Sequence, residues 1–327
     1  MLNSSLPWTK DYHSLFSKKQ LSHAYLISGR KGIGKKQLAE EISRKILCKE
    51  ERFLDSCRCN SCKLFISSNH PDFHLIEREK EKKQIGINQI RECFDDLFES
   101  SFLNGNKIFL IYPAEAMNKD ASNSALKILE EPPKNSLFIL VSHRSQLLTP
   151  TILSRCSEIK VNTPKREQVK AWLKTEGVED RDVELALNLS KNRPIEAAKL
   201  LSQSLNENRE LFISNISDII KKGENIILVS EEWSKDLESL PIKIEWMVDL
   251  LRDSLRHHFY QESCNTTSDT DHISSYLGKK VNNQTLFQLL EETNKTWNGI
   301  NDETNLRIDY LLKALFISWN IELAISS

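Results

Sequence analysis

The sequence predicts a parallel α/β domain at the start of the chain, followed by two helical segments. Three observations support this prediction. Strand-like and helix-like segments alternate up to about residue 163, and the strands are continuous apolar runs, as expected when both faces of a sheet are buried. After Thr163 and Pro164 the apolar residues follow only helical spacing. We expect domains at 1–163, 164–204 and 205–327.

The composition agrees with a helix-rich globular chain. The 327 residues include only 9 Gly and 9 Pro, which argues against low-complexity disorder and against a turn-dense β-sandwich. Apolar residues make up 39% of the chain, enough for real cores. No run approaches the roughly 18 to 20 apolar residues that span a bilayer, and the first residues do not resemble a secretory signal. We therefore expect a cytoplasmic protein with no membrane partner.

The charge is distributed unevenly along the chain. Residues 1–204 carry 33 Lys+Arg against 26 Asp+Glu, a balance of +7, whereas residues 205–327 carry 12 against 20, a balance of −8. Such an asymmetry suggests that the first part meets phosphates or acidic partners. Two solvated surfaces of different composition are an equally good explanation from charge alone.

The alternating domain begins with a strand at 21–28 that runs into a cluster of glycines. The segment after the glycines has apolar residues at 38, 39, 42, 46 and 47, which is helical spacing. The later elements are predicted in this order: a strand at 73–76, a helix from 87, a strand at 107–112, a helix from 118, a strand at 137–142, a short helix from 150 and a strand at 158–161. The helix from 118 should end at Glu130 and Glu131, because Pro132 and Pro133 cannot continue it. Pro150 fits the first turn of its helix.

The glycine cluster resembles a phosphate-binding loop. Gly29, Gly32, Gly34 and Lys35 match the pattern G-x-x-x-x-G-K-[ST] through the lysine, but Lys36 stands where Ser or Thr is required. In such loops backbone N–H groups and a helix N-terminus favour phosphate, and the hydroxyl binds Mg²⁺. An ammonium group cannot replace that hydroxyl.

A second metal contact is also absent. A neighbouring buried strand normally ends in an acidic residue that helps to hold Mg²⁺, but the strand at 107–112 ends in Tyr112, and Glu115 comes too late. We therefore expect no hydrolysis at this loop. Two alternatives stay open: retained binding of ATP or ADP, and a purely structural turn, which we favour.

Four cysteines lie within fifteen residues. Cys48, Cys57, Cys59 and Cys62 supply four thiolates, which suit a closed tetrahedral Zn²⁺ site with a structural role. The spacing C-x-C departs from the common C-x₂-C chelate, so Cys57 and Cys59 can bind together only with a tighter turn, or one of the two drops out of the ligand set. The alternative is four reduced thiols with no shared role.

Several motifs together resemble one protein family. They are HAYLISG at 23–29, the cysteine cluster followed by SNHPDFHLI at 68–76, IGINQIRE at 85–92, ASNSALKILEEPP at 121–133 and TILSRC at 151–156. This run is similar to bacterial clamp-loader subunits of the AAA+ superfamily, and most similar to the delta-prime subunits of DNA polymerase III. The motifs cover residues 20–160 densely, and WMVDLLRDSLR at 246–256 resembles the start of the collar helices.

The resemblance implies a fold and a function. It implies an AAA+ domain of the P-loop NTPase type with a zinc knuckle, a small helical lid and an all-α collar that oligomerises. Delta-prime subunits are stators that do not hydrolyse ATP and that present an arginine to the ATP site of an adjacent gamma or tau subunit. Ser154, Arg155 and Cys156 match that Ser-Arg-Cys motif, so the resemblance implies that Arg155 is an arginine finger. Without it, a surface salt bridge would be the ordinary interpretation of Arg155.

The implied partners are the gamma/tau and delta subunits, with the sliding clamp and primer–template DNA reached through the complex. Two alternative functions remain. One is an active ATPase of the gamma/tau type, which the missing hydroxyl and Tyr112 disfavour. The other is a zinc-containing nucleic-acid-binding module that forms no ring.

Overall fold

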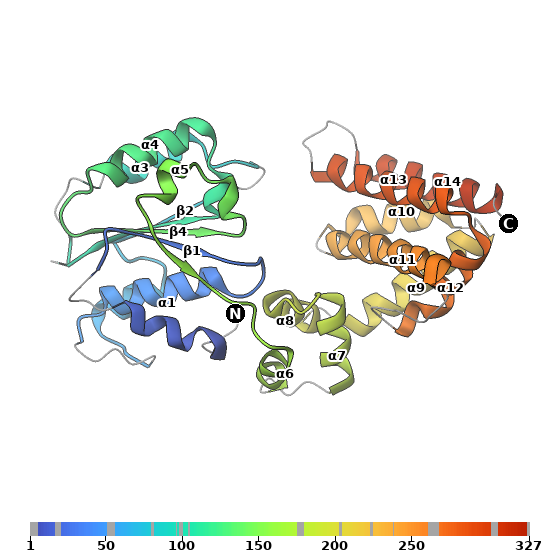
Figure 1. The fold of residues 1–327 in the computed structure, drawn as a ribbon, viewed down its shortest axis with the longest axis horizontal. Helices are drawn as coiled ribbons and strands as arrows, with labels where there is room; N and C mark the ends of the chain where they lie inside the picture. Colours follow the sequence, from blue (N-terminus) through green and yellow to red (C-terminus); the bar gives the residue numbers. More distant parts are fainter. Residues whose placement is uncertain are drawn as a thin grey trace. The chain divides into compact units, whose positions relative to one another are not determined.

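A computed structural model describes residues 6–16, 21–50, 56–79, 82–95, 97, 101–103, 105–174, 180–202, 205–222, 225–237, 239–260, 268–301 and 307–325. The chain divides into two compact units (Figure 1). The first comprises residues 1–176 with 193–196, and the second comprises residues 177–192 with 197–327. The three-domain division at residues 163 and 204 stays a prediction.

The first unit is built on a parallel sheet of five strands. Their order across the sheet is β2-β3-β4-β1-β5, and every neighbouring pair is parallel. The strands are β1 (Ala24–Ser28), β2 (Phe73–Glu77), β3 (Lys107–Tyr112), β4 (Ser136–Ser142) and β5 (Ser157–Lys160). All five predicted strands are therefore present, and the predicted parallel α/β class is confirmed.

The first unit also contains helices, several of which cover the two faces of the sheet. They are η1 (Pro7–Leu15), α1 (Lys35–Leu47), α2 (Asn60–Ile66), α3 (Ile87–Asp95), η3 (Ala114–Ala116), α4 (Lys119–Glu130), η4 (Ser145–Leu147), α5 (Pro150–Leu153) and α6 (Arg166–Lys174). Figure 1 shows α3, α4 and α5 on one face and α1 on the other. The helices predicted from residues 35, 87, 118 and 150 are all confirmed, whereas the sequence reasoning did not predict α2 or η1.

Alternate side chains of each strand enter two separate cores. Leu26 packs among residues of α3 and α4, whereas its neighbour Ile27 packs among residues of α1. Successive side chains of a strand point to opposite faces, so a strand buried on both faces must be apolar throughout. This explains the continuous apolar runs. The apolar residues of α1 that were predicted to form one stripe are all buried: Leu38, Ala39, Ile42, Ile46 and Leu47.

Local sequence signals set the ends of α4 and the start of α5. The Asn118 side chain caps α4 by accepting a hydrogen bond from the Ala121 N–H at 2.8 Å. At its other end α4 stops at Glu130, two residues before Pro132, as predicted. Pro150 is the first residue of α5, where its missing N–H costs nothing.

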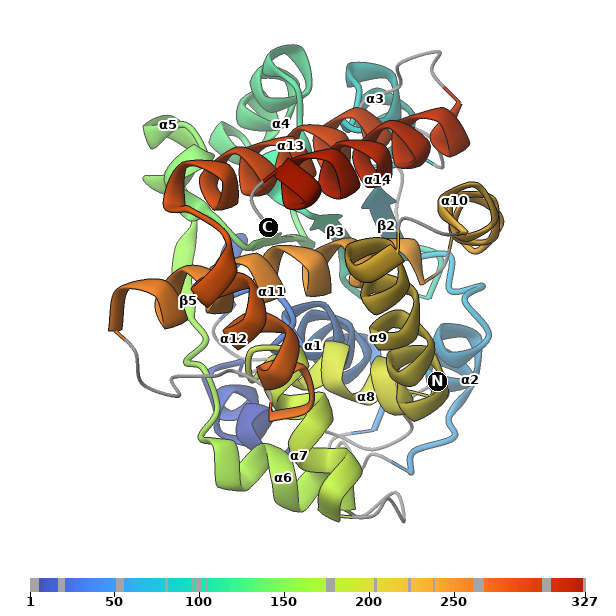
Figure 2. The same ribbon diagram turned by 90° about the vertical axis from the view of Figure 1, so that its right-hand side faces the viewer.

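The described part of the second unit is helical throughout. Its helices are α7 (Asp180–Leu189), α8 (Pro194–Ser202, whose first residues belong to the first unit), α9 (Leu205–Lys222), α10 (Ile226–Lys235), α11 (Leu240–Tyr260), η5 (Ser268–Thr270), α12 (Asp271–Lys280), α13 (Asn283–Asn301) and α14 (Ile308–Ile325). Figure 2 shows α13 and α14 side by side. The core of this unit is aromatic: Phe212, Trp233, Trp246, Phe316 and Trp319 are fully buried. Within the described residues no helix is both long and apolar enough to cross a membrane.

Candidate functional site

The glycine cluster forms a loop between β1 and α1, at the carboxyl edge of the sheet. We call residues 29–36 the phosphate loop. Gly34 adopts φ +90° and stands directly before the first residue of α1, and a Cβ there would lie 2.0 Å from Leu6 Cδ1. Glycine is therefore required by both backbone conformation and space. The strand, glycine turn and helix that the sequence predicted are all present.

The Lys35 side chain points back into the loop. Its Nζ donates to the carbonyl oxygens of Gly29 and Arg30, each at 2.6 Å, and lies 3.0 Å from His143 Nδ1. The residue is only 2% exposed. An ammonium group has three N–H donors, so these three acceptors inside the first unit use all of them.

His143 follows β4 and completes this buried cluster. Burial, followed by the charge of Lys35, lowers the pKa of His143 to about 4. The ring is therefore neutral at pH 7, and Nδ1 accepts the Lys35 proton, which assigns the ring hydrogen to Nε2. The backbone N–H of His143 donates to Glu115 Oε1 at 3.0 Å. Burial lowers the pKa of Lys35 to about 8, although the carboxylates of Glu115 and Glu196 oppose this effect.

Lys36 occupies the position where a metal-binding hydroxyl would stand. Its Nζ lies 2.6 Å from Glu77 Oε1 and 3.8 Å from Glu40 Oε1, and 5.4 Å from the centre of the Tyr112 ring. The side chain therefore holds two carboxylates by ion pairing. A lysine in this arrangement repels a divalent cation, which agrees with the sequence argument against Mg²⁺ binding.

Glu196 lies against the phosphate loop from the start of α8. A Cβ built on Gly32, whose φ is +80°, would lie 1.8 Å from Glu196 Oε2. The neighbouring Ile195 N–H donates to the Gly32 carbonyl at 3.0 Å. The Glu196 carboxylate therefore lies beside the loop, where its charge would repel an incoming phosphate group.

The second group of predicted site residues is the finger segment, residues 154–156, which joins α5 to β5. Arg155 Nη2 lies 2.6 Å from Glu130 Oε1, and Nη1 donates to the Thr151 carbonyl at 2.9 Å. Arg155 keeps 33% of its side-chain surface exposed. Among the contacts recorded between described residues, none joins Arg155 to the phosphate loop.

The neighbours of Arg155 fix the direction of its side chain. Ser154 Oγ donates to the Thr151 carbonyl at 3.0 Å and accepts from Arg155 Nη1 at 3.3 Å. Cys156 packs against the core on the α3/α4 face of the sheet, where burial raises the pKa of its thiol to about 11. The neutral thiol thus anchors the segment while the guanidinium remains accessible.

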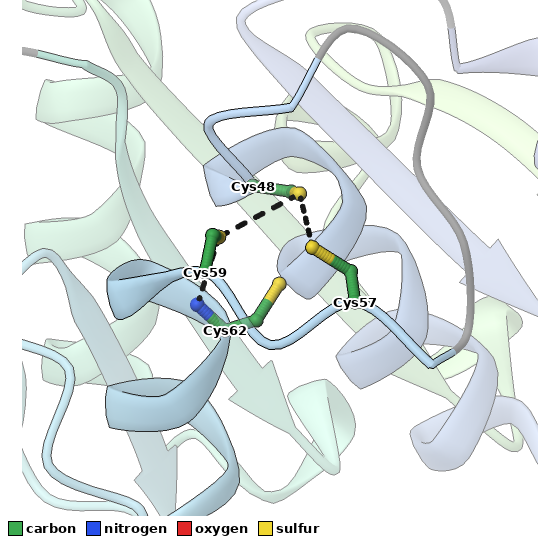
Figure 3. A group of neighbouring side chains, drawn as sticks. All are labelled: Cys48, Cys57, Cys59 and Cys62. Atoms are coloured by element: carbon green, nitrogen blue, oxygen red, sulfur yellow. Dashed lines mark hydrogen bonds between the residues drawn. The ribbon is translucent and has the colours of Figure 1, made fainter.

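The four clustered cysteines converge on one point (Figure 3). All four sulfur atoms lie within 4.8 Å of one another, with Cys48 Sγ 3.6 Å from Cys57 Sγ and 3.9 Å from Cys59 Sγ. A tetrahedral Zn²⁺ with Zn–S bonds of about 2.3 Å places its sulfurs about 3.8 Å apart. The donor set therefore fits zinc, and the C-x-C spacing does not keep Cys57 or Cys59 away from the group.

Two helix ends hold the cysteines in place. Cys48 immediately follows α1, and Cys59 caps the N-terminus of α2, where its sulfur accepts from the Cys62 N–H at 3.5 Å. Burial opposes the thiolate of Cys59, but hydrogen bonds from the Cys62 and Lys49 backbones outweigh it and lower its pKa to about 6. A thiolate is the form that binds metal.

Sequence reasoning missed the residues that occupy the phosphate loop. The sequence excludes Glu115 only from the usual metal-binding position at the end of the strand, and it predicts neither His143 nor Glu196 as a partner of the loop. His143 could have been found, because the carboxyl ends of neighbouring parallel strands meet at one edge of the sheet. At the end of β4, Ser142 Oγ accepts a hydrogen bond from the Arg144 N–H at 3.1 Å, as a residue that caps a turn does. Beside the loop, Arg193 Nη1 lies 3.7 Å from Glu196 Oε1.

Comparisons of the sequence with known proteins identify one family. A family model described as "DNA polymerase III, delta subunit" matches residues 7–165. DNA polymerase III subunit delta′ of Pseudomonas aeruginosa is 30% identical over 319 residues, covering 96% of this chain and 96% of that protein. The delta′ subunit of Escherichia coli is 30% identical over 258 residues, covering 77% and 76%. Among solved structures, a DNA polymerase III gamma subunit-related protein of Thermotoga maritima matches with a TM-score of 0.47 and 18% identity, covering 97% of this chain and 99% of that chain.

Proposed function

The chain belongs to the family of DNA polymerase III delta′ subunits, and we propose that it is the non-hydrolysing stator of a clamp-loader complex. In this role it helps to load the sliding clamp onto primed DNA and supplies Arg155 in trans to the ATP site of a neighbouring subunit. Its first unit has the AAA+ fold class expected of the family. The observation that carries the proposal is that Lys35 uses all three of its donors on the chain's own acceptors.

The phosphate loop supports the absence of hydrolysis in this chain. Lys35 has no donor left for a phosphate group, and Lys36 is paired with carboxylates. Tyr112 stands at the end of β3 where an acidic residue would hold Mg²⁺. The site therefore lacks both the groups that would hold Mg²⁺ and a lysine donor that could bind the outer phosphates. This favours a structural turn over nucleotide binding.

The finger segment supports the action in trans. A guanidinium group stabilises charge that develops on a transferring phosphoryl group, and such fingers contribute about 10³ to 10⁵ in rate. Arg155 is partly exposed, and the half-buried Cys156 fixes the segment beside it. This arrangement suits a side chain that is presented to another protein.

The remaining parts of the chain have proposed roles in assembly. We assign the lid to residues 164–204 and the oligomerising collar to residues 205–327, with gamma/tau and delta subunits as partners. The clamp and primer–template DNA are reached through the complex. A cytoplasmic location follows from this role.

An ATPase assay on the reconstituted complex tests the function. The chain alone should show no turnover, whereas the complex with gamma and delta, clamp and primed DNA should hydrolyse ATP. Arg155→Ala should leave assembly intact in native mass spectrometry and reduce turnover at the adjacent site by about 10³-fold or more. Arg91→Ala, which removes an exposed arginine of α3, is the matched control and should have no effect. Turnover by the isolated chain would show an active ATPase, and failure to form a mixed complex would favour the nucleic-acid-binding module.

We also propose that Cys48, Cys57, Cys59 and Cys62 hold a structural Zn²⁺. The ion would hold together the end of α1 and the start of α2, in a segment with little apolar material of its own. The purified chain should contain stoichiometric zinc, and Cys59→Ser should lower both the zinc content and the melting temperature. Cys93→Ser, outside the group, should retain the metal. Unchanged zinc content in Cys59→Ser would exclude this cysteine from the ligand set.

A further inference from the structure

Glu130 lies beside the arginine finger and belongs to a different element. It is the last residue of α4, whereas Arg155 follows α5, yet Arg155 Nη2 and Glu130 Oε1 are 2.6 Å apart. A separation of this size is typical of a strong, charge-assisted hydrogen bond. The contact joins residues 25 positions apart, so the fold of the first unit sets it.

The packing of α4 fixes where Glu130 lies. Ala121, Ala125 and Leu129 recur every four residues along α4 and are all buried against the α3/α4-side core. This stripe determines the rotation of the helix about its axis. Glu130 follows the last of these residues and keeps 45% of its side-chain surface exposed, on the side where Arg155 stands.

The position of Glu130 is unfavourable for the helix itself. A carboxylate in the last turn faces the negative end of the helix dipole, where Lys or Arg would be stabilising. Only Lys127 supplies a basic residue in that turn of α4. The guanidinium of Arg155 offsets the charge of Glu130, so the two side chains stabilise one another.

The same contacts leave the guanidinium able to bind a phosphate. Thr151 and Ser154 accept from Nη1, and Glu130 lies against Nη2. A guanidinium has five N–H donors in a fixed plane, and these contacts hold that plane from two sides. Binding of a phosphate costs an arginine side chain less conformational entropy when its guanidinium plane is already held in place.

We propose that Glu130 is a positioning residue for the arginine finger, which orients the Arg155 guanidinium before the neighbouring subunit and its nucleotide are bound. The proposal rests on the proposed function of Arg155. Glu130 touches neither nucleotide nor partner in this role and acts through Arg155 alone.

Glu130→Gln in the reconstituted complex tests this role. The substitution keeps the size of the side chain and removes its charge. We expect kcat of ATP hydrolysis at the adjacent site to fall about three- to tenfold, which is the scale of one partly exposed ion pair. The KM for ATP and the assembly of the complex should not change, because the neighbour's own residues bind the nucleotide. Glu131→Gln, one residue further on, is the matched control and should match the wild type.

A double-mutant cycle separates positioning from a merely structural effect. In an Arg155→Ala background, Glu130→Gln should cause no further loss, because the side chain it orients is absent. Equal losses from Glu130→Gln in both backgrounds would overturn the proposal, as would an unchanged or increased kcat in the single variant. If Arg155→Ala itself left turnover unchanged, the finger assignment would fail first. A loss with Arg155→Ala and none with Glu130→Gln would overturn only the role of Glu130.

Discussion

The phosphate loop and the finger segment both carry basic residues suited to phosphate, but they direct them oppositely. In the phosphate loop Lys35 is buried, and its ammonium is enclosed by two carbonyl oxygens and a neutral imidazole. In the finger segment Arg155 is a third exposed, and its guanidinium is held by Thr151 and Ser154 at Nη1 and by Glu130 at Nη2. A cation whose donors are all used stabilises the fold, whereas a cation with donors left can serve another molecule.

The acidic neighbours of the two sites differ in the same way. Glu196 lies against the phosphate loop itself, at the position of a Gly32 Cβ. Glu130 lies beside Arg155 and leaves part of the guanidinium open. The first arrangement disfavours a phosphate group in the loop, and the second, in the role we propose, orients a cation toward one. We infer that this domain retains the arginine that acts at the ATP site of a neighbouring subunit. It lacks the groups that would bind and hydrolyse ATP at its own phosphate loop.

Removing the Lys35 ammonium gives the largest expected change in stability. Lys35→Met leaves the Gly29 and Arg30 carbonyls without their donor in a partly buried site. The lost hydrogen bonds cost about 2–5 kcal/mol in the free energy of unfolding, and removal of a charge that is disfavoured by burial, which lowers the pKa of Lys35, offsets part of that cost. The ATPase of the assembled complex should not change, the reverse of Arg155→Ala. Urea unfolding of the chain and turnover of the complex measure the two effects.

Lys36→Met provides the matched control for this variant. Its ion pairs are partly exposed, so the expected loss is below about 1 kcal/mol. If the two substitutions cost the same, Lys35 would not be a structural cation. If Lys35→Met lowered the ATPase of a stably assembled complex, the phosphate loop would take part in catalysis.

Replacing Gly32 by alanine should lower the stability of the fold less than Lys35→Met does. The residue has φ +80°, a conformation that costs an L-residue about 1–2 kcal/mol, and its Cβ would displace the Glu196 carboxylate. Gly32→Ala should therefore lower the urea midpoint. In the double variant, Glu196→Ala should restore the stability that the clash with the carboxylate removes. The loss of stability caused by the strained backbone of Gly32→Ala should remain.

Gly86→Ala is the control for a glycine-to-alanine change without strain or clash. Nothing described lies within 4 Å of a Cβ at that position, so the change in unfolding free energy should stay within about 0.5 kcal/mol. A Gly32→Ala chain as stable as the wild type would mean that the loop and Glu196 separate readily, and the comparison with the open finger segment would then weaken.

The sequence predicted the elements well because each has a local signal. The apolar runs became strands, and Pro132 ended α4 where expected. The seven residues of α2 escaped notice because a helix of two turns is too short to show an apolar periodicity. The four cysteines and the glycine loop were recognisable because their members lie close together in the chain.

The partners that determine what each site does were harder to predict. Lys35 meets His143 across 108 positions of sequence, and Arg155 meets Glu130 across 25. Such contacts depend on strand order and on helix rotation, which no local pattern specifies. The sequence could therefore show that the phosphate loop lacks its metal ligands, but not that its lysine and a distant glutamate fill it.

The last prediction concerns the pH dependence of stability that His143 contributes. Burial beside Lys35 lowers its pKa to about 4 in the folded chain, with Lys31 and Arg144 adding to the effect and Glu115 opposing it. The unfolded chain, with an ordinary histidine pKa near 6.5, therefore binds the proton first as the pH falls. His143 thus makes the fold less stable as the pH falls from about 6.5 to about 4, and has no such effect above that range.

Because carboxylates titrate over the same range, the informative quantity is the difference between wild type and His143→Gln in urea midpoints at pH 5, 6 and 7. That difference should change in the direction of a wild type that loses more stability on acidification. A constant difference would mean that His143 accepts a proton while folded, so it could not accept the Lys35 hydrogen bond that distinguishes the closed phosphate loop from the open finger segment.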